Sequence, residues 1–231
     1  MVVHCIKTGR NTIWIWVLVL LPLAGPVAYI AVELLPELLG SRGARRAVRG
    51  VRRAMDPEQD LRRAEQKVKL SGDVQSRQQY AAEPIRMGRP AEAVDVCRSM
   101  LVGIYEKDPA LLLGLAQAQF AAEDFSAVRD ILDALIRDNP SFKSADGHLL
   151  YARATEGAGD TAKALEEYRA LAAYYPGAEA AVRYARLLRK QGQSDEARKL
   201  LREVVDRAEL APAHYKKMQR EWLDEARRES R

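Results

Sequence analysis

A pattern of residue types that recurs about every 33 residues constrains the fold of this chain more than any other feature. Its clearest copy has a small residue, a turn glycine, a second small residue, an aromatic residue and a proline, at Ala152, Gly159, Ala164, Tyr168 and Pro176. The alanines let two helices approach closely, the glycine permits a tight turn, the tyrosine fills the gap to the next pair, and the proline ends the second helix. The pattern therefore predicts helical hairpins, which must stack to bury their apolar faces.

Three further stretches carry the pattern with varying completeness. Ala185, Gly192 and Ala197 repeat it downstream, and Ala197 lies 33 residues after Ala164. Two upstream copies are degenerate, and in one of them Glu123 replaces the turn glycine. The other upstream copy consists of Ala81, Gly88, Ala93 and Pro109. We expect four hairpins, over residues 71–108, 109–144, 145–177 and 178–211.

The end of such a stack needs a helix whose outer side is polar. Apolar residues recur near the C-terminus at three- and four-residue intervals among charged ones, at Tyr215, Met218, Trp222 and Ala226. We therefore expect one capping helix over residues 212–231, with Trp222 packed into the core. Stacking of Trp222 on a ligand is the alternative interpretation.

This order of residue types resembles the tetratricopeptide repeat. The resemblance implies an all-α fold, a right-handed superhelix of about four hairpins, whose first helices line a concave groove that binds a protein or peptide. The groove-facing positions would be Gln78, Arg86, Gln117, Phe120, Arg153, Glu156, Arg186, Arg189 and Lys190. The basic C-terminal part of this set would suit a carboxylate-bearing peptide, because arginine can hold a carboxylate through two hydrogen bonds. Solvated helix faces are the alternative for each residue.

The segment from residue 13 to residue 32 carries no charge and predicts a membrane helix. At about 1.5 Å per residue, its roughly 20 residues match a hydrocarbon core of about 30 Å. Trp14 and Trp16 stand near one end and Tyr29 near the other, as expected of rings at the headgroup level. We expect a membrane anchor over residues 1–39.

Two alternatives for this segment stay open. Pro22, Gly25 and Pro26 would kink a helix, which allows a re-entrant segment that enters one leaflet only. A cleaved signal peptide is the other alternative, although the apolar run is longer than such peptides need. Cys5, just before the segment, would be available for lipidation.

Positive charge is concentrated beside the apolar segment. Residues 1–54 carry eight Lys or Arg against two Glu, so the formal net charge of +5 arises there and the remainder is close to neutral. Most of these charges follow the segment, so the positive-inside rule places the repeats in the cytoplasm, on a single-pass protein of the inner membrane. A basic, polar connector is expected over residues 40–70. Contacts to lipid headgroups are expected from Trp14, Trp16, Arg42, Arg45, Arg46 and Arg49.

The apolar segment also resembles the short membrane module at the N-terminus of cardiolipin synthases and related phospholipase D proteins. The resemblance rests on Trp16, Leu21-Pro22, Gly25-Pro26 and Tyr29. In those families the module attaches the enzyme to the membrane, and catalysis depends on a duplicated HxKxxxxD motif elsewhere. This chain has only a single near-match, His214-Tyr215-Lys216 with Glu221 in place of the aspartate. The resemblance therefore implies attachment without phospholipase activity.

The sequence predicts no catalytic residues, no metal and no cofactor. Its three histidines are far apart, its carboxylates have the spacing of helix surfaces, and the common nucleotide, hydrolase and zinc motifs are absent. Cys97 lies on an apolar helix face and is expected to be a small core residue. We expect a membrane-anchored, non-catalytic scaffold for protein partners. The alternatives are an accessory role in envelope or phospholipid metabolism, and nucleic-acid binding through the Arg42–Arg53 cluster.

Overall fold

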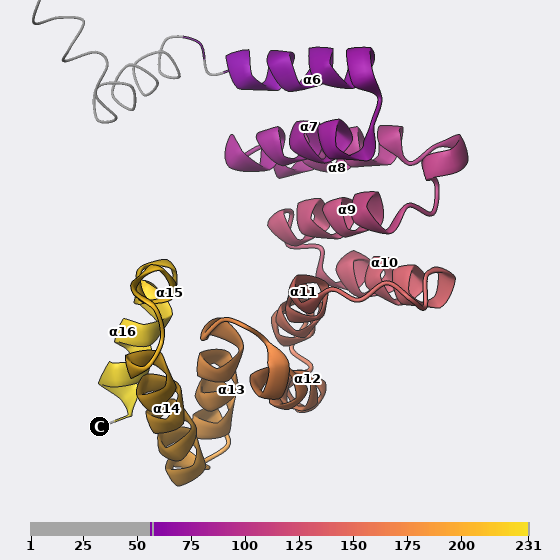
Figure 1. The fold of residues 1–231 in the computed structure, drawn as a ribbon. Helices are drawn as coiled ribbons and strands as arrows, with labels where there is room; N and C mark the ends of the chain where they lie inside the picture. Colours follow the sequence, from indigo (N-terminus) through magenta and orange to yellow (C-terminus); the bar gives the residue numbers. More distant parts are fainter. Residues whose placement is uncertain (1–55, 57, 231) are drawn as a thin grey trace, which may run out of the picture. The chain divides into compact units, whose positions relative to one another are not determined.

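The computed structural model describes residue 56 and residues 58–230, and Leu61–Arg231 form one compact unit. Eleven α-helices and one short 3-10 helix make up the described part, which contains no strand, so the predicted all-α fold is confirmed there (Figure 1). None of the described helices is both long enough and apolar enough to cross a bilayer. The predicted membrane anchor, with Trp14, Trp16 and Arg42 to Arg49, lies outside the described residues.

Four helical hairpins follow one another in chain order (Figure 1). Each pairs two antiparallel helices and lies within one of the four residue ranges expected for a repeat. The hairpins are α7 (Val74–Arg86) with α8 (Pro90–Met100), α9 (Pro109–Ala121) with α10 (Phe125–Asp138), α11 (Ala145–Gly157) with α12 (Thr161–Tyr174), and α13 (Glu179–Lys190) with α14 (Ser194–Glu209).

Within the described residues, one further helix precedes the hairpins, at the end of the stretch expected to be a connector. Helix α6 (Gln59–Ser71) lies next to α7 and is joined to it by polar contacts, including a 2.8 Å hydrogen bond from Lys67 Nζ to Gln79 Oε1. Ala64 is its only buried residue. The sequence of this segment is charged and poor in alanine, so it did not predict a helix. The helix covers the start of the repeats.

Side-chain caps set where the consecutive helices α9 to α12 begin. Asp108, Asp124, Ser144 and Asp160 each accept a hydrogen bond from a backbone N–H of the first helical turn. Pro109, which the sequence placed at the end of the first hairpin, is instead the first residue of α9. A proline is well suited there, because its missing N–H would have no partner inside the helix.

The turn inside each hairpin needs one residue with a positive φ angle. Gly88, Gly159 and Gly192 supply it, with φ of 71°, 84° and 82°. Glu123 takes the corresponding place in the second hairpin with φ of 61°, the only non-glycine residue of the described chain in this conformation. The predicted replacement of the turn glycine is therefore confirmed, and it leaves a local strain that glycine would not have.

The core forms where small residues let helices meet. Ala152, Ala164 and Ala197 have no exposed surface, and Tyr168 is completely buried between its own hairpin and α13. The Tyr168 hydroxyl donates to Glu156 Oε2 at 2.7 Å, so its polar end is satisfied. Cys97 is 2% exposed, as predicted for a core residue, and burial raises the pKa of its thiol to about 11.

The C-terminal cap differs from the single helix that the sequence predicts. It consists of a short helix α15 (Ala213–Met218) and a longer helix α16 (Arg220–Glu229), which packs against α13 and α14. Met218 was expected on the apolar face but is 77% exposed, because the chain changes direction at the next residue. Leu223 takes the core position instead, at 1% exposed. Trp222 packs against the core but is only partly buried.

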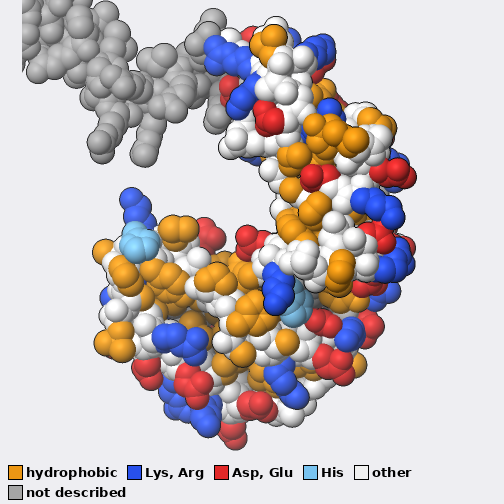
Figure 2. All heavy atoms as spheres, turned by 45° about the vertical axis from the view of Figure 1, so that its right-hand side comes forward, with side chains coloured by type: hydrophobic (Ala, Val, Ile, Leu, Met, Phe, Trp, Pro, Cys, Tyr) orange, Lys and Arg blue, Asp and Glu red, His pale blue; other side chains and the backbone are white. Residues whose placement is uncertain are grey.

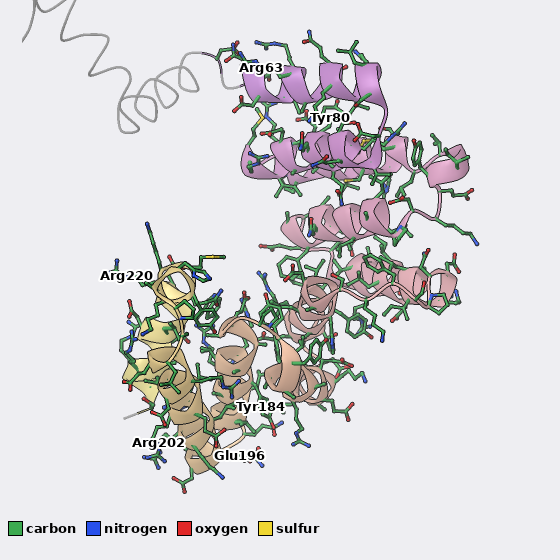
Figure 3. The ribbon with its side chains drawn as sticks, viewed as in Figure 1. Arg63, Tyr80, Tyr184, Glu196, Arg202 and Arg220 are labelled. Atoms are coloured by element: carbon green, nitrogen blue, oxygen red, sulfur yellow. The ribbon has the colours of Figure 1, made fainter. Side chains whose placement is uncertain are left out.

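Basic and acidic side chains are intermixed along the right-hand and lower edges of the face shown in Figure 2. Hydrophobic side chains gather between these edges. On the outer side of α14, Glu196 and Arg202 extend into solvent, whereas Tyr184 of α13 is buried and accepts a hydrogen bond from Arg169 Nε at 2.9 Å (Figure 3). The alternation of signs agrees with the near-neutral charge of the repeat region.

The strain at Glu123 yields a first prediction. We expect Glu123→Gly to raise the free energy of unfolding by about 1 kcal/mol, because glycine adopts the left-handed conformation without the Cβ clash. The same change at Glu203, exposed in the middle of α14, should lower it by about 1 kcal/mol. Urea unfolding followed by circular dichroism measures both. Equal destabilisation by the two changes would contradict the role of residue 123 in the turn.

Candidate functional site

The first helices of successive hairpins contact one another along one side of the stack. Helix α7 packs against α9, and α9 packs against α11. A cavity of about 350 Å³ opens on this side, lined by residues of α7, α9, α11 and α13 and of the loop before α13. Its walls bring together three of the predicted groove residues, Gln117, Phe120 and Arg153. This cavity is the candidate functional site.

Within this cavity, Arg153 has a hydrogen-bond donor without a partner. Its guanidinium lies over the Phe120 ring, 4.6 Å from the ring centroid, and Phe120 is itself held by an edge-on contact with Phe125. The buried Nε of Arg153 has no hydrogen-bond partner, and the Glu179 carboxylate, at 3.7 Å, is too far to accept one. The guanidinium is therefore held over Phe120 in the cavity wall, and its buried Nε is left without a hydrogen-bond partner.

Carboxylates surround Arg153 but are bound to other groups. Glu179 accepts a 2.8 Å hydrogen bond from Arg183 Nε. Asp146 accepts a 3.1 Å hydrogen bond from the hydroxyl of Tyr175, whose pKa is raised to about 12 by burial and by that carboxylate. Sequence reasoning missed Glu179 and Tyr175. Tyr175 lies in the loop before α13 and Glu179 is the first residue of α13, whereas the predicted positions lie inside the first helices.

The predicted basic end of the groove is paired with the C-terminal helix. Arg186 binds Glu225 of α16 through two hydrogen bonds of 2.5 and 2.6 Å, and Arg189 donates to Glu229 at 2.8 Å. Trp222 lies under the guanidinium of Arg186, 5.5 Å from it. Of the three basic residues predicted here, Lys190, at the end of α13, is the one classed as exposed, whereas Arg186 and Arg189 are partly buried. These pairs offset much of the positive charge expected at this end.

The family model of the tetratricopeptide repeat matches residues 85–154 and 157–221, which is more than half of the chain. The chain belongs to the tetratricopeptide repeat family. The resemblance seen in the sequence is thus confirmed, and with it the repeat superhelix. Proteins of this family generally bind protein partners and act as non-catalytic scaffolds.

Solved structures agree with this tetratricopeptide fold. The thermophilic repeat protein TTC0263 of Thermus thermophilus is 19% identical, with a TM-score of 0.56, and the match covers 74% of this chain and 87% of that one. A crystal structure of MamA is also 19% identical, with a TM-score of 0.55 and coverage of 73% and 95%. A MamA fragment from Desulfovibrio magneticus is 15% identical, with a TM-score of 0.56 and coverage of 72% and 95%. No curated protein matches the chain. These likenesses show the fold alone.

The paired C-terminal arginines yield a second prediction. A double-mutant cycle with Arg186→Gln and Glu225→Gln should give a coupling energy of about 1 kcal/mol, since the pair is bidentate and Glu225 is mostly shielded from water. The exposed pair of Arg198 and Asp195 should give less than about 0.5 kcal/mol. Urea unfolding of the full chain measures both cycles. A coupling energy near zero for the first pair would mean that Arg186 is available to a partner.

Proposed function

We propose that this protein is a membrane-anchored, non-catalytic scaffold that recruits a protein partner into the groove lined by α7, α9, α11 and α13. The observation that carries the proposal is the state of Arg153, whose Nε has no hydrogen-bond partner and lies 3.7 Å from the Glu179 carboxylate, while Phe120 fixes the position of the guanidinium. An arginine held in this way loses little side-chain entropy when it binds, so it favours recognition of a partner.

The chemistry of Arg153 defines what the partner presents there. A guanidinium is only a donor, so the partner must supply an acceptor: a carboxylate, which it can hold through two hydrogen bonds, or a backbone carbonyl. Leu149 and Leu150 line the same cavity and would contact an apolar side chain next to that acceptor. An extended segment with a carboxylate beside an apolar residue fits this cavity best.

The same proposal places the repeats on the cytoplasmic side of the inner membrane. Its support is the uncharged segment of residues 13–32 and the excess of arginine after it. A role in phospholipid metabolism or nucleic-acid binding would rest on residues 1–53 alone, and no contact of the described repeats favours either.

Partner recovery tests the groove. We expect Arg153→Gln to reduce the amount of partner that co-purifies from detergent-solubilised membranes by about tenfold, because a charge-assisted hydrogen bond is lost. Arg202→Gln, which removes the same charge from an exposed site on α14, is the matched control. Unfolding curves of both variants exclude a loss of the fold. Equal recovery with both variants would refute the role of Arg153.

Protease accessibility tests the orientation. In inside-out vesicles the repeats should be cut by added protease, and in intact spheroplasts they should be protected. Detergent lysis of the spheroplasts should restore cleavage, which verifies that the protease is active. Cleavage of the repeats in intact spheroplasts would place them on the opposite side of the membrane.

A further inference from the structure

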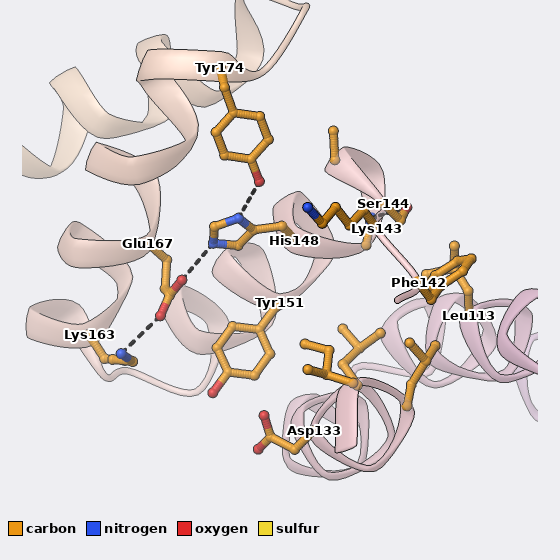
Figure 4. Close-up of a pocket in the computed structure, with 15 residues that line it drawn as sticks. Leu113, Asp133, Phe142, Lys143, Ser144, His148, Tyr151, Lys163, Glu167 and Tyr174 are labelled. Atoms are coloured by element: carbon orange, nitrogen blue, oxygen red, sulfur yellow. Dashed lines mark hydrogen bonds and ion pairs between the residues drawn. The ribbon is translucent and has the colours of Figure 1, made fainter. Parts of the chain in front are cut away.

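A second and larger cavity lies on another side of α11. It has a volume of about 530 Å³ and is formed by α10, α11, α12 and the loop between α10 and α11, together with Leu113 of α9 (Figure 4). It shares no lining residue with the groove cavity, because Gly147, His148 and Tyr151 lie on a different face of α11 from Leu149, Leu150 and Arg153. A volume of this size is typical of small-molecule sites.

The floor of this cavity is apolar and its rim exposes large apolar side chains. Leu132 and Leu135 form part of the floor and are 3% and 2% exposed. At the rim, Ile136 and Tyr174 are 58% and 54% exposed, which is high for such residues. A ligand with an apolar body would cover surface that water now contacts.

One wall is polar, but its groups are already bound to one another. The Tyr174 hydroxyl lies 2.5 Å from His148 Nδ1, His148 Nε2 lies 2.6 Å from Glu167, and Glu167 pairs with Lys163 at 2.9 Å (Figure 4). Burial acts to raise the pKa of Glu167, but hydrogen bonds from Lys163 and His148 outweigh it and lower the pKa overall. The Glu167 carboxylate therefore stays charged, and the charge of Lys163 balances it. These hydrogen bonds hold the polar wall in a fixed arrangement.

The mouth of the cavity carries one cationic side chain, Lys143, that is not paired with a carboxylate of the described residues. Lys143 is exposed, makes no ion pair within the described residues, and points its ammonium group toward the side on which His148 lies (Figure 4). The opposite rim carries Asp133 beside Tyr151, whose pKa is raised by burial and by that carboxylate. The charges at the mouth therefore favour an anion at one end only, near Lys143.

We propose that this cavity binds a small organic anion, with an apolar body on the floor of Leu132, Leu135 and Phe142 and its acidic group beside Lys143. The site is independent of the groove, so a partner and this ligand can bind at the same time. The ligand would contact α10, α11 and α12 together and would stabilise the contact between the second and third hairpins.

Three probes with the same apolar body test the charge that the cavity prefers: 3-phenylpropanoate, the neutral 3-phenylpropan-1-ol and 3-phenylpropylammonium. Saturation-transfer NMR on the full chain in detergent, with empty micelles as the blank, gives their dissociation constants. We expect saturable binding of the acid, about threefold tighter than that of the alcohol, as for a half-exposed ion pair. The ammonium compound should bind weakest, because it meets Lys143 at the mouth. Tightest binding of the ammonium compound, or no saturable binding of the acid, overturns the proposal.

Matched variants test where the probes bind. Lys143→Gln should remove the preference for the acid over the alcohol, whereas Lys199→Gln, at an exposed site of α14, should leave it unchanged. Ile136→Ser should weaken binding of all three probes by about threefold, and Ile104→Ser, at a residue that is 90% exposed elsewhere, should not. Because all four side chains are exposed, the fold should tolerate each change. If Lys143→Gln keeps the preference, or if both isoleucine variants behave alike, the site is not this cavity.

Discussion

The close approach of helices at alanine positions is the constraint on which the other features of this molecule depend. Ala152 and Ala164 meet inside one hairpin without any exposed surface, and Tyr168 then fills the space toward the next hairpin. Because van der Waals contact falls off over less than an ångström, a larger side chain at either alanine would push the helices apart. The small residues therefore set the distance between the two helices of a hairpin, and Tyr168 fills the space to the next hairpin.

The consequence is clearest at α11, which contacts a cavity on each of two faces. Arg153 faces the groove, whereas His148, about one and a half helical turns earlier, faces the second cavity. The core uses Ala152 and Ala154, which lie between these faces, and also Leu149 and Leu150 on the groove side. Because small residues pack on the core side of α11, its longer polar side chains can line the two cavities. Arg153 and His148 thus line the two cavities, whereas Ala152 and Ala154 pack in the core.

Sequence reasoning succeeded where the determinant is local and failed where it joins distant residues. The turn at Gly159 and the strained turn at Glu123 follow from one position each, so they could be predicted. The pairing of Arg186 with Glu225 joins residues 39 apart, and that of His148 with Tyr174 joins residues 26 apart. Periodicity gives the face of a helix but not the partner that a later helix brings to it. The prediction that Met218 lies on the apolar face was wrong for a related reason. The chain changes direction between α15 and α16, so the apolar face of α16 does not continue that of α15.

The C-terminal helix also changes which part of the groove can bind a charged partner. A partner that used Arg186 would have to replace Glu225, which already supplies two short hydrogen bonds and belongs to the same chain. An intramolecular carboxylate competes at a high effective concentration, so a free peptide would gain little there. The carboxylate paired with Arg153, that of Glu179, lies 3.7 Å from its Nε and is already hydrogen-bonded to Arg183, so it competes less strongly. The pairing with the capping helix therefore argues against recognition at the basic end, where the sequence suggested it, and favours the proposed site in the middle of the groove.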